Sequence, residues 1–193
     1  MSQYICVDIG GTSIKHGVLD ENAIIKECNQ TKTEAWLGGA AVLDKVKTIG
    51  KQYKEQYENI EGICISTAGM VDPEEGKIVF AGELMPDYTG TCIKKELEKA
   101  LEMPCEVEND VNCAGLAEYV SGSAKESHIM FCATVGTGIG GCAIVNGRVF
   151  HGASNSACEV GYIPMGDSDF QTLGASSILV RKVAEKKIEP LDM

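Results

Sequence analysis

Short apolar stretches separated by polar turns run through most of the chain, a pattern typical of an α/β protein. Alternating or continuous apolar residues predict strands, and apolar residues at helical spacing predict helices. The predicted strands cover residues 4–9, 13–19, 23–28, 61–67, 77–80, 105–109, 128–134, 140–145 and 148–151. The predicted helices cover residues 38–57, 91–101, 111–121 and 175–187.

The order of these elements predicts an α/β fold with a mixed sheet, flanking helices and two lobes. Residues 1–121 form the first lobe in this prediction, and residues 122–193 begin a second lobe that repeats the three-stranded opening. Three strands and one helix are too few to cover the second sheet, so we expect that lobe to be incomplete and the chain to be truncated. An uncovered apolar face would favour self-association.

Two glycine-rich turns occupy corresponding places in the two predicted lobes. The first contains Asp8, Gly10, Gly11 and Thr12, and the second spans residues 136–141. A strand that delivers a carboxylate and turns through Gly-Gly-Thr can surround a phosphate tail with N–H groups, a hydroxyl and a metal-holding charge. The alternative is a plain β-hairpin that needs glycine for positive φ. Two turns of matching design favour a nucleotide site.

The residues after these turns exclude two common nucleotide motifs. Neither turn continues into Gly-Lys-Ser/Thr, as a Walker loop does. Each is followed by a strand and not by a helix, which also excludes the dinucleotide fingerprint.

Two further segments combine polar side chains with a predicted change of structure. Asn109 and Asp110 lie where a strand gives way to a helix, so Asp110 is either an N-cap or a general base at the carboxyl end of a central strand. Glu159 ends a loop of small residues, which is either a solvated loop or an anchor for sugar hydroxyls. We expect Trp36 to pack at the start of the first long helix.

Charge and cysteine content indicate which partners and which cellular compartment fit this chain. The net charge of −11 argues against binding to nucleic acid or to an anionic membrane surface. The nine cysteines form no short-spaced pairs, which favours reduced thiols in a cytoplasmic protein. The sequence suggests neither a signal peptide nor an apolar run long enough for a membrane span.

Four segments, in order, resemble the motifs of the ROK family, which comprises repressors, open reading frames and sugar kinases of the actin-like ATPase superfamily. They are the first phosphate loop, a Gly-x-Val-Asp turn, a catalytic segment and the second phosphate loop: Asp8–Thr12, Ser66–Asp72, Glu108–Asp110 and Gly136–Gly141. The resemblance covers essentially the whole chain. It implies an actin-like ATPase (ribonuclease H-like) fold with an incomplete second lobe.

The resemblance also implies an activity: ATP-dependent phosphorylation of a sugar hydroxyl, the 6-OH of a hexose or β-glucoside. In that family pattern Asp110 is the general base, and Asn109, Glu159 and Gly69 contact the sugar. Asp8 holds Mg²⁺ through water. The residues that the resemblance assigns to ATP and its phosphates are Asp8, Gly10, Gly11, Thr12, Lys15, Gly136, Thr137, Gly138 and Gly140.

The chain departs from the family pattern at a metal site and in length. Many members have a histidine and a cysteine-rich zinc motif after the glutamate, whereas Glu159 here is followed by Val160, Gly161 and Tyr162, and no cysteine follows Cys158. We therefore expect no zinc and a likeness to the β-glucoside kinase and glucokinase branch. Members are also longer, so we expect this chain to bind ATP weakly or not at all by itself.

The resemblance leaves a second functional class open. A non-catalytic, sugar-sensing ROK protein would keep the same fold and sugar pocket. A DNA-binding repressor is disfavoured because the first strand begins at residue 4 and leaves no room for a preceding helix-turn-helix. The expected partners are a sugar, ATP and a second copy of the chain.

Overall fold

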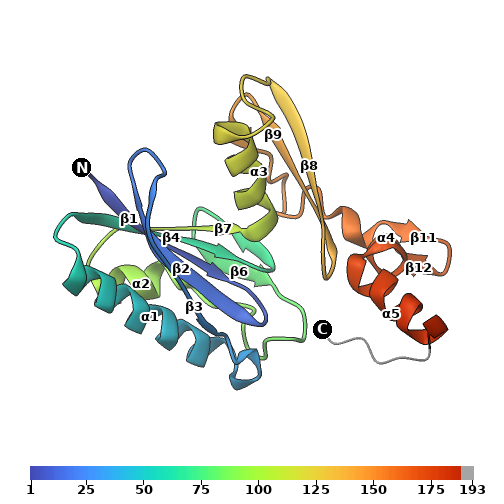
Figure 1. Cartoon of the computed structure of the whole chain (residues 1–193), viewed down its shortest axis with the longest axis horizontal. Helices are drawn as coiled ribbons and strands as arrows, with labels where there is room; N and C mark the ends of the chain where they lie inside the picture. Colours follow the sequence, from blue (N-terminus) through green and yellow to red (C-terminus); the bar gives the residue numbers. More distant parts are fainter. Residues whose placement is uncertain (188–193) are drawn as a thin grey trace. The chain divides into compact units, whose positions relative to one another are not determined.

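The computed structural model describes residues 1–187 and divides the chain into two compact units, Met1–Asp110 and Val111–Met193 (Figure 1). Each unit has its own sheet and its own cluster of buried apolar side chains. Each is described by itself below.

Unit 1 is built on a five-stranded mixed sheet with the order β3-β2-β1-β4-β7. The strands β1, β2 and β3 form an antiparallel meander, and β4 and β7 add to β1 in parallel. Their bounds are Gln3–Ile9, Ser13–Asp20, Ile25–Lys32, Ile60–Thr67 and Cys105–Asn109 for β1, β2, β3, β4 and β7. The mixed sheet expected from the sequence is confirmed.

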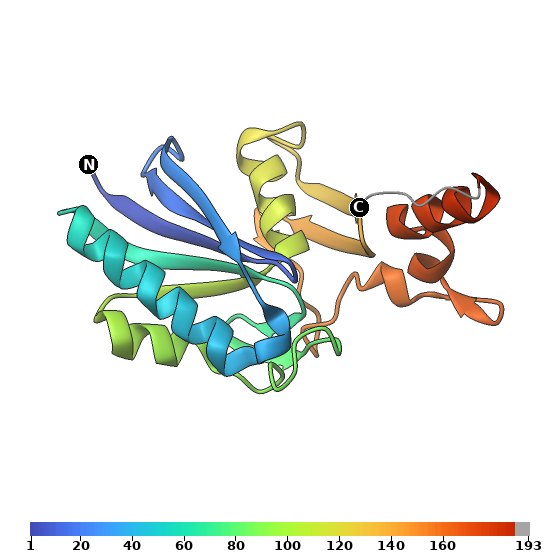
Figure 2. The ribbon, with the colours of Figure 1, turned by 60° about the horizontal axis from the view of Figure 1, so that its bottom comes forward.

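Helices α1 (Gly39–Gln56) and α2 (Ile93–Leu101) lie together on one side of this sheet, as Figures 1 and 2 both show. Alternate residues of β1 point into the buried core, including Ile5 and Val7, where they join Val46 of α1. This alternation explains why the strand pattern was readable from the sequence. Shorter elements complete unit 1: the 3₁₀ turn η1 (Ala35–Leu37) and the hairpin of β5 (Met70–Asp72) and β6 (Lys77–Phe80).

Unit 2 contains a three-stranded antiparallel sheet with the order β10-β9-β8. The strands β8, β9 and β10 span Ile129–Val135, Ile139–Val145 and Arg148–Val149. Helix α3 (Asp110–Ser121) packs on one face, where a Cβ atom on Gly115 would come within 2.6 Å of the Cys142 sulfur. The domain boundary expected after residue 121 therefore differs from the observed one, because the buried contacts of α3 group it with β8 and β9.

The rest of unit 2 consists of short elements. They are η2 (Val160–Tyr162), the hairpin of β11 (Pro164–Met165) and β12 (Ser168–Asp169), and helices α4 (Phe170–Gly174) and α5 (Ser176–Lys187). Of these, the sequence predicts α5. Among the described residues, helices are all too short or too polar to cross a bilayer.

Candidate active site

Three parallel strands of unit 1 end side by side and bring the predicted polar residues together. Asp8 of β1 is in register with Ser66 of β4, which is in register with Glu108 of β7. The Ser66 hydroxyl donates a hydrogen bond to the Asp8 carboxylate at 2.8 Å, from Oγ to Oδ1. The carboxyl ends of parallel strands are where open α/β sheets bind ligands, so this edge is the candidate site.

The first glycine-rich turn leaves β1 at this edge and is fixed by Thr33, which follows β3. The Gly10 N–H donates to the Ser13 carbonyl at 3.1 Å, which makes the turn tight. The Thr33 N–H donates to the Thr12 carbonyl at 3.0 Å, and its hydroxyl donates to the Gly10 carbonyl at 2.6 Å. Gly11 is exposed, and a Cβ atom there would meet no atom within 4 Å, so a ligand can approach its backbone closely.

Lys15, also assigned to ATP, lies directly across the ladder from Asp8. Register partners in an antiparallel pair present their side chains on the same face. Lys15 is exposed and therefore places a positive charge on the sheet face that carries Asp8.

The predicted catalytic segment at the end of β7 is joined to Gly69 by one side-chain amide. Asn109 donates from Nδ2 to the Gly69 carbonyl at 2.9 Å and to Oδ1 of Asp110 at 3.0 Å. Gly69 has φ of 102° and no room for a side chain, since a Cβ atom would lie 2.7 Å from the Phe80 carbonyl. Asp110 is the first residue of α3, so its interpretation as a helix cap and its interpretation as a base remain compatible.

Thiols lie next to this edge in the same register. Cys6 pairs with Cys64 two residues before the Asp8 and Ser66 pair. A hydrogen bond from the Cys6 thiol lowers the pKa of Cys64 to about 7.

In unit 2, the second glycine-rich turn connects β8 to β9 and is held by the start of α5. The Gly136 N–H donates to the Gly138 carbonyl at 2.9 Å. The Ser176 N–H donates to the Gly136 carbonyl at 3.0 Å, and the Ser177 hydroxyl donates to the Thr137 carbonyl at 2.7 Å. The turn is thus anchored by residues about forty positions later in the chain.

Two of its glycines also have packing reasons. A Cβ atom on Gly140 would lie 2.5 Å from a methyl group of Val111 in α3, and one on Gly138 would lie 2.8 Å from the Gln171 side-chain oxygen. Gly136 has no such neighbour within 4 Å. Gly136 is therefore the glycine of this turn with the clearest approach for a ligand.

Glu159 is positioned by the loop that crosses β9. A Cβ atom on Gly141 would come within 2.6 Å of the Cys158 carbonyl, so the loop backbone lies directly on the strand. Glu159 then caps the 3₁₀ turn η2, where its carbonyl accepts the Tyr162 N–H at 3.2 Å. Glu159, the residue predicted to bind the sugar, therefore has a defined backbone position in unit 2.

The donor set near Asp8 fits a magnesium ion. Mg²⁺ prefers oxygen ligands and is commonly held by one or two carboxylates together with water and substrate phosphates. Asp8 supplies a carboxylate, and Ser66 orients it. Within residues 1–187 the structure contains no group of three or more His, Cys, Asp or Glu side chains placed to bind a metal by themselves.

Hydroxyl groups account for most of what the sequence analysis missed. Thr33 holds the first turn, and Ser176 and Ser177 hold the second, yet isolated serines and threonines carry no motif signal. Thr33 lies about twenty residues after the first turn in the sequence, and the pairing of the strands brings it next to that turn.

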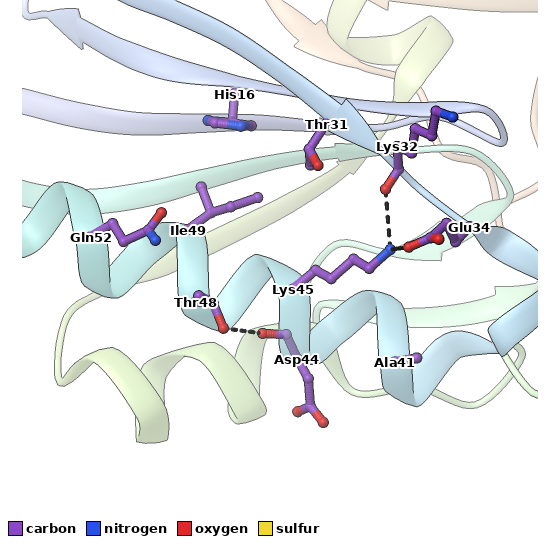
Figure 3. A pocket seen from close by; sticks show the side chains of 10 residues that line it. All are labelled: His16, Thr31, Lys32, Glu34, Ala41, Asp44, Lys45, Thr48, Ile49 and Gln52. Atoms are coloured by element: carbon purple, nitrogen blue, oxygen red, sulfur yellow. Dashed lines mark hydrogen bonds and ion pairs between the residues drawn. The ribbon is translucent and has the colours of Figure 1, made fainter.

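A cavity on the helix-covered side of unit 1 was also not predicted. It has a volume of about 760 Å³ and lies between α1 and the strands β2 and β3 (Figure 3). His16 lines it and bonds through Nδ1 to the Tyr53 hydroxyl at 2.8 Å, and burial lowers the pKa of His16.

Sequence relatives of this chain include named sugar kinases. This chain is 50% identical over 191 residues to an uncharacterised protein of Clostridium perfringens, and the alignment covers 98% of this chain and 64% of that protein. It is 33% identical to a β-glucoside kinase of Listeria monocytogenes, covering 81% and 51%, and 32% identical to a glucokinase of Streptomyces coelicolor, covering 86% and 50%. The chain thus spans about half to two thirds of the length of these relatives.

Solved structures and a family model agree with this result. A ROK glucokinase of Streptomyces griseus, in complex with glucose and AMPPNP, matches with a TM-score of 0.84 and 27% identity, over 97% of this chain and 62% of that chain. The likeness confirms the expected actin-like fold. A ROK transcriptional regulator, a homologue of the E. coli MLC protein, shares the fold at a TM-score of 0.81 and 18% identity, over 97% and 51%. The ROK family model matches residues 4–175, and the chain therefore belongs to the ROK family.

Proposed function

We propose that this chain provides the catalytic edge of an ATP-dependent sugar kinase. The observation that carries the proposal is the meeting of a carboxylate, a glycine-rich turn and the Asn109–Asp110 pair at the carboxyl ends of β1, β4 and β7. Phosphoryl transfer depends on positioning and charge stabilisation, and these are the groups it needs. The named kinases among the relatives support the same reaction class.

Each residue has a defined part in the proposed reaction. Asp110 accepts the proton of the attacking sugar hydroxyl, the 6-OH of a hexose or β-glucoside. Asn109, Gly69 and Glu159 bind the other hydroxyls. The residues assigned to ATP phosphates are Asp8, Gly10, Gly11, Thr12, Lys15, Gly136, Thr137, Gly138 and Gly140. When bound, Mg²⁺ neutralises phosphate charge, and Asp8 would hold it through water.

A coupled assay of the full-length gene product tests this function. The substrates are ATP with glucose, N-acetylmannosamine and a panel of β-glucosides, and we expect turnover of at least one of them. The matched control for the 6-OH is 6-deoxyglucose, which keeps the other hydroxyl groups of glucose but has no 6-OH to phosphorylate. Turnover of 6-deoxyglucose would show that another hydroxyl is the acceptor, and no turnover of any hexose would contradict the kinase.

The alternative is a sugar-sensing ROK protein without catalysis. A regulator shares the fold, which keeps this alternative open. Calorimetry distinguishes the two, because a sensor would bind a sugar in the presence of ATP without producing ADP. In either case we propose a cytoplasmic protein that contains no zinc, and elemental analysis of the purified protein should find less than stoichiometric zinc.

A further inference from the structure

We propose that Thr33 and Lys45 form a clamp: Thr33 binds the carbonyl groups of the first phosphate loop, and Lys45 binds the backbone around Thr33. Both are then positioning residues for the binding of ATP. The proposal rests on the kinase function above, because it assigns a role to the same loop. Neither side chain belongs to the motifs that mark the loop in the sequence.

Thr33 holds the loop at two points. Its N–H bonds the Thr12 carbonyl at 3.0 Å, and its hydroxyl bonds the Gly10 carbonyl at 2.6 Å. These carbonyl oxygens flank Gly11, whose backbone is open to a ligand. A carbonyl oxygen repels a phosphate, so two carbonyls that are bound on the protein side cannot turn toward it.

Thr33 is itself suited to hold a fixed position. It is 0% exposed, and a buried hydroxyl with a hydrogen-bond partner has few alternative arrangements. The loss of this hydroxyl would leave the Gly10 carbonyl without its donor. The loop would then gain freedom at the residue that precedes Gly11.

Lys45 connects the clamp to helix α1. Its ammonium group donates to the carbonyls of Lys32 and Thr33, at 3.2 and 2.9 Å, and forms an ion pair with Glu34. Figure 3 shows the Lys45 side chain reaching from α1 to Lys32, the last residue of β3, and to Glu34. One lysine therefore ties the residues on both sides of Thr33 to the long helix.

The second phosphate loop shows the same principle with different residues. The Ser176 N–H, the Ser176 hydroxyl and the Ser177 hydroxyl donate to the carbonyls of Gly136, Val135 and Thr137. Both loops therefore have their carbonyl oxygens bound by hydroxyl and N–H donors from a distant segment. This recurrence supports a positioning role in place of an incidental contact.

Hydrogen exchange of the 193-residue chain tests the clamp without reference to activity. In Thr33→Val, which keeps the branched shape, we expect amides of residues 8–15 to exchange up to about tenfold faster. Thr33→Ser should restore the slower exchange. Thr31→Val, at an exposed threonine two residues earlier in β3, should leave it unchanged. Equal exchange in Thr33→Val and the wild type, or an equal effect of Thr31→Val, would overturn the proposal.

Lys45→Met provides an independent test if Thr33→Val does not fold. Its exchange in residues 8–15 should rise, whereas that of Lys51→Met, at an exposed lysine of the same helix, should not. No rise in Lys45→Met would overturn the assignment of Lys45.

Kinetics of the full-length gene product then give the functional readout. We expect Thr33→Val to lower kcat/KM for ATP up to about tenfold while the KM for the sugar stays unchanged, and Thr33→Ser to restore it. An equal change in both substrates would indicate a structural role only and overturn the proposal. If the wild type has no kinase activity, the proposed function fails, and the hydrogen exchange result still decides whether the clamp exists.

Discussion

Single side chains at the strand ends carry the proposed chemistry, and Asp110 is the one on which it depends most. Asp110→Asn should lower kcat about 10²- to 10⁴-fold, because the amide cannot accept the proton. Its oxygen can still accept the hydrogen bond from Asn109, so sugar affinity should stay within a few-fold of the wild type. Steady-state kinetics and calorimetry measure the two effects. Asp44→Asn, at an exposed carboxylate on α1, is the control. A near-normal kcat of Asp110→Asn would mean that Asp110 is only a helix cap.

Tyr88 gives a second prediction at this scale, for stability at high pH. Burial raises the pKa of Tyr88 to about 12, and its hydroxyl bonds Thr67 at 2.8 Å. In the unfolded chain the phenol ionises near pH 10, so between about pH 10 and pH 12 the unfolded state binds fewer protons and stability falls as pH rises. This loss amounts to about 2 to 3 kcal/mol.

The Tyr88→Phe variant isolates that contribution. Urea unfolding at pH 8 and at pH 11 should show a smaller loss of stability for Tyr88→Phe than for the wild type. Tyr162→Phe, at a tyrosine that is 55% exposed, should behave as the wild type does. Identical pH dependence in Tyr88→Phe and the wild type would contradict the prediction.

Residues with a motif were predictable, and residues that act through one hydroxyl were not. Asp8, the two glycine-rich turns and Asn109–Asp110 stand in recognisable local patterns. Thr33 has no motif, and Ser66 lies within the Ser66–Asp72 motif, but the partners of both depend on the register of the sheet. The prediction for Trp36 was wrong: it lies in η1 and is 70% exposed, because the residues that bury the start of α1 are its neighbours Ala35 and Gly39.

At the scale of elements, the packing of α3 on β9 leads to a prediction for Gly115. Gly115→Ala should destabilise unit 2 by about 1 to 3 kcal/mol, because the new methyl group would lie 2.6 Å from the Cys142 sulfur. Thermal unfolding measures the change. Gly82→Ala is the matched control, since a Cβ atom there meets nothing within 4 Å. An equal stability of both variants would mean that α3 can shift away from β9 at little cost.

Elements with an apolar alternation were predictable, and elements made of polar residues were not. The apolar pattern predicts that the third strand ends at residue 28, but β3 continues to Lys32, because pairing with β2 maintains the strand where its side chains are exposed. The segment Ser66–Asp72 is predicted as a turn, yet its last three residues form β5 by pairing with β6. Short strands of two or three residues lack the length that periodicity needs.

At the scale of the whole molecule, the sheet of unit 2 predicts self-association of this chain. Ile129, Phe131 and Val145 are 72%, 58% and 38% exposed, and the strand register places them on one face. Light scattering at micromolar concentration should therefore report a dimer or larger species. Phe131→Glu should shift the chain toward monomer, and Phe80→Glu, at an exposed phenylalanine of unit 1, should not. A monomeric wild type would contradict this prediction.

The division at Asp110 has a consequence for biosynthesis. Every strand of the larger sheet, together with α1 and α2, comes from the first of the two units, and β7 is both its last strand in sequence and an outer strand of the sheet. A ribosome that has released this stretch has delivered all the partners that the sheet requires, while the second unit is still being translated. Domains generally fold as units during synthesis, with the N-terminal one first. The nascent chain can therefore complete the half that carries Asp8 and Asn109 before the second unit is complete.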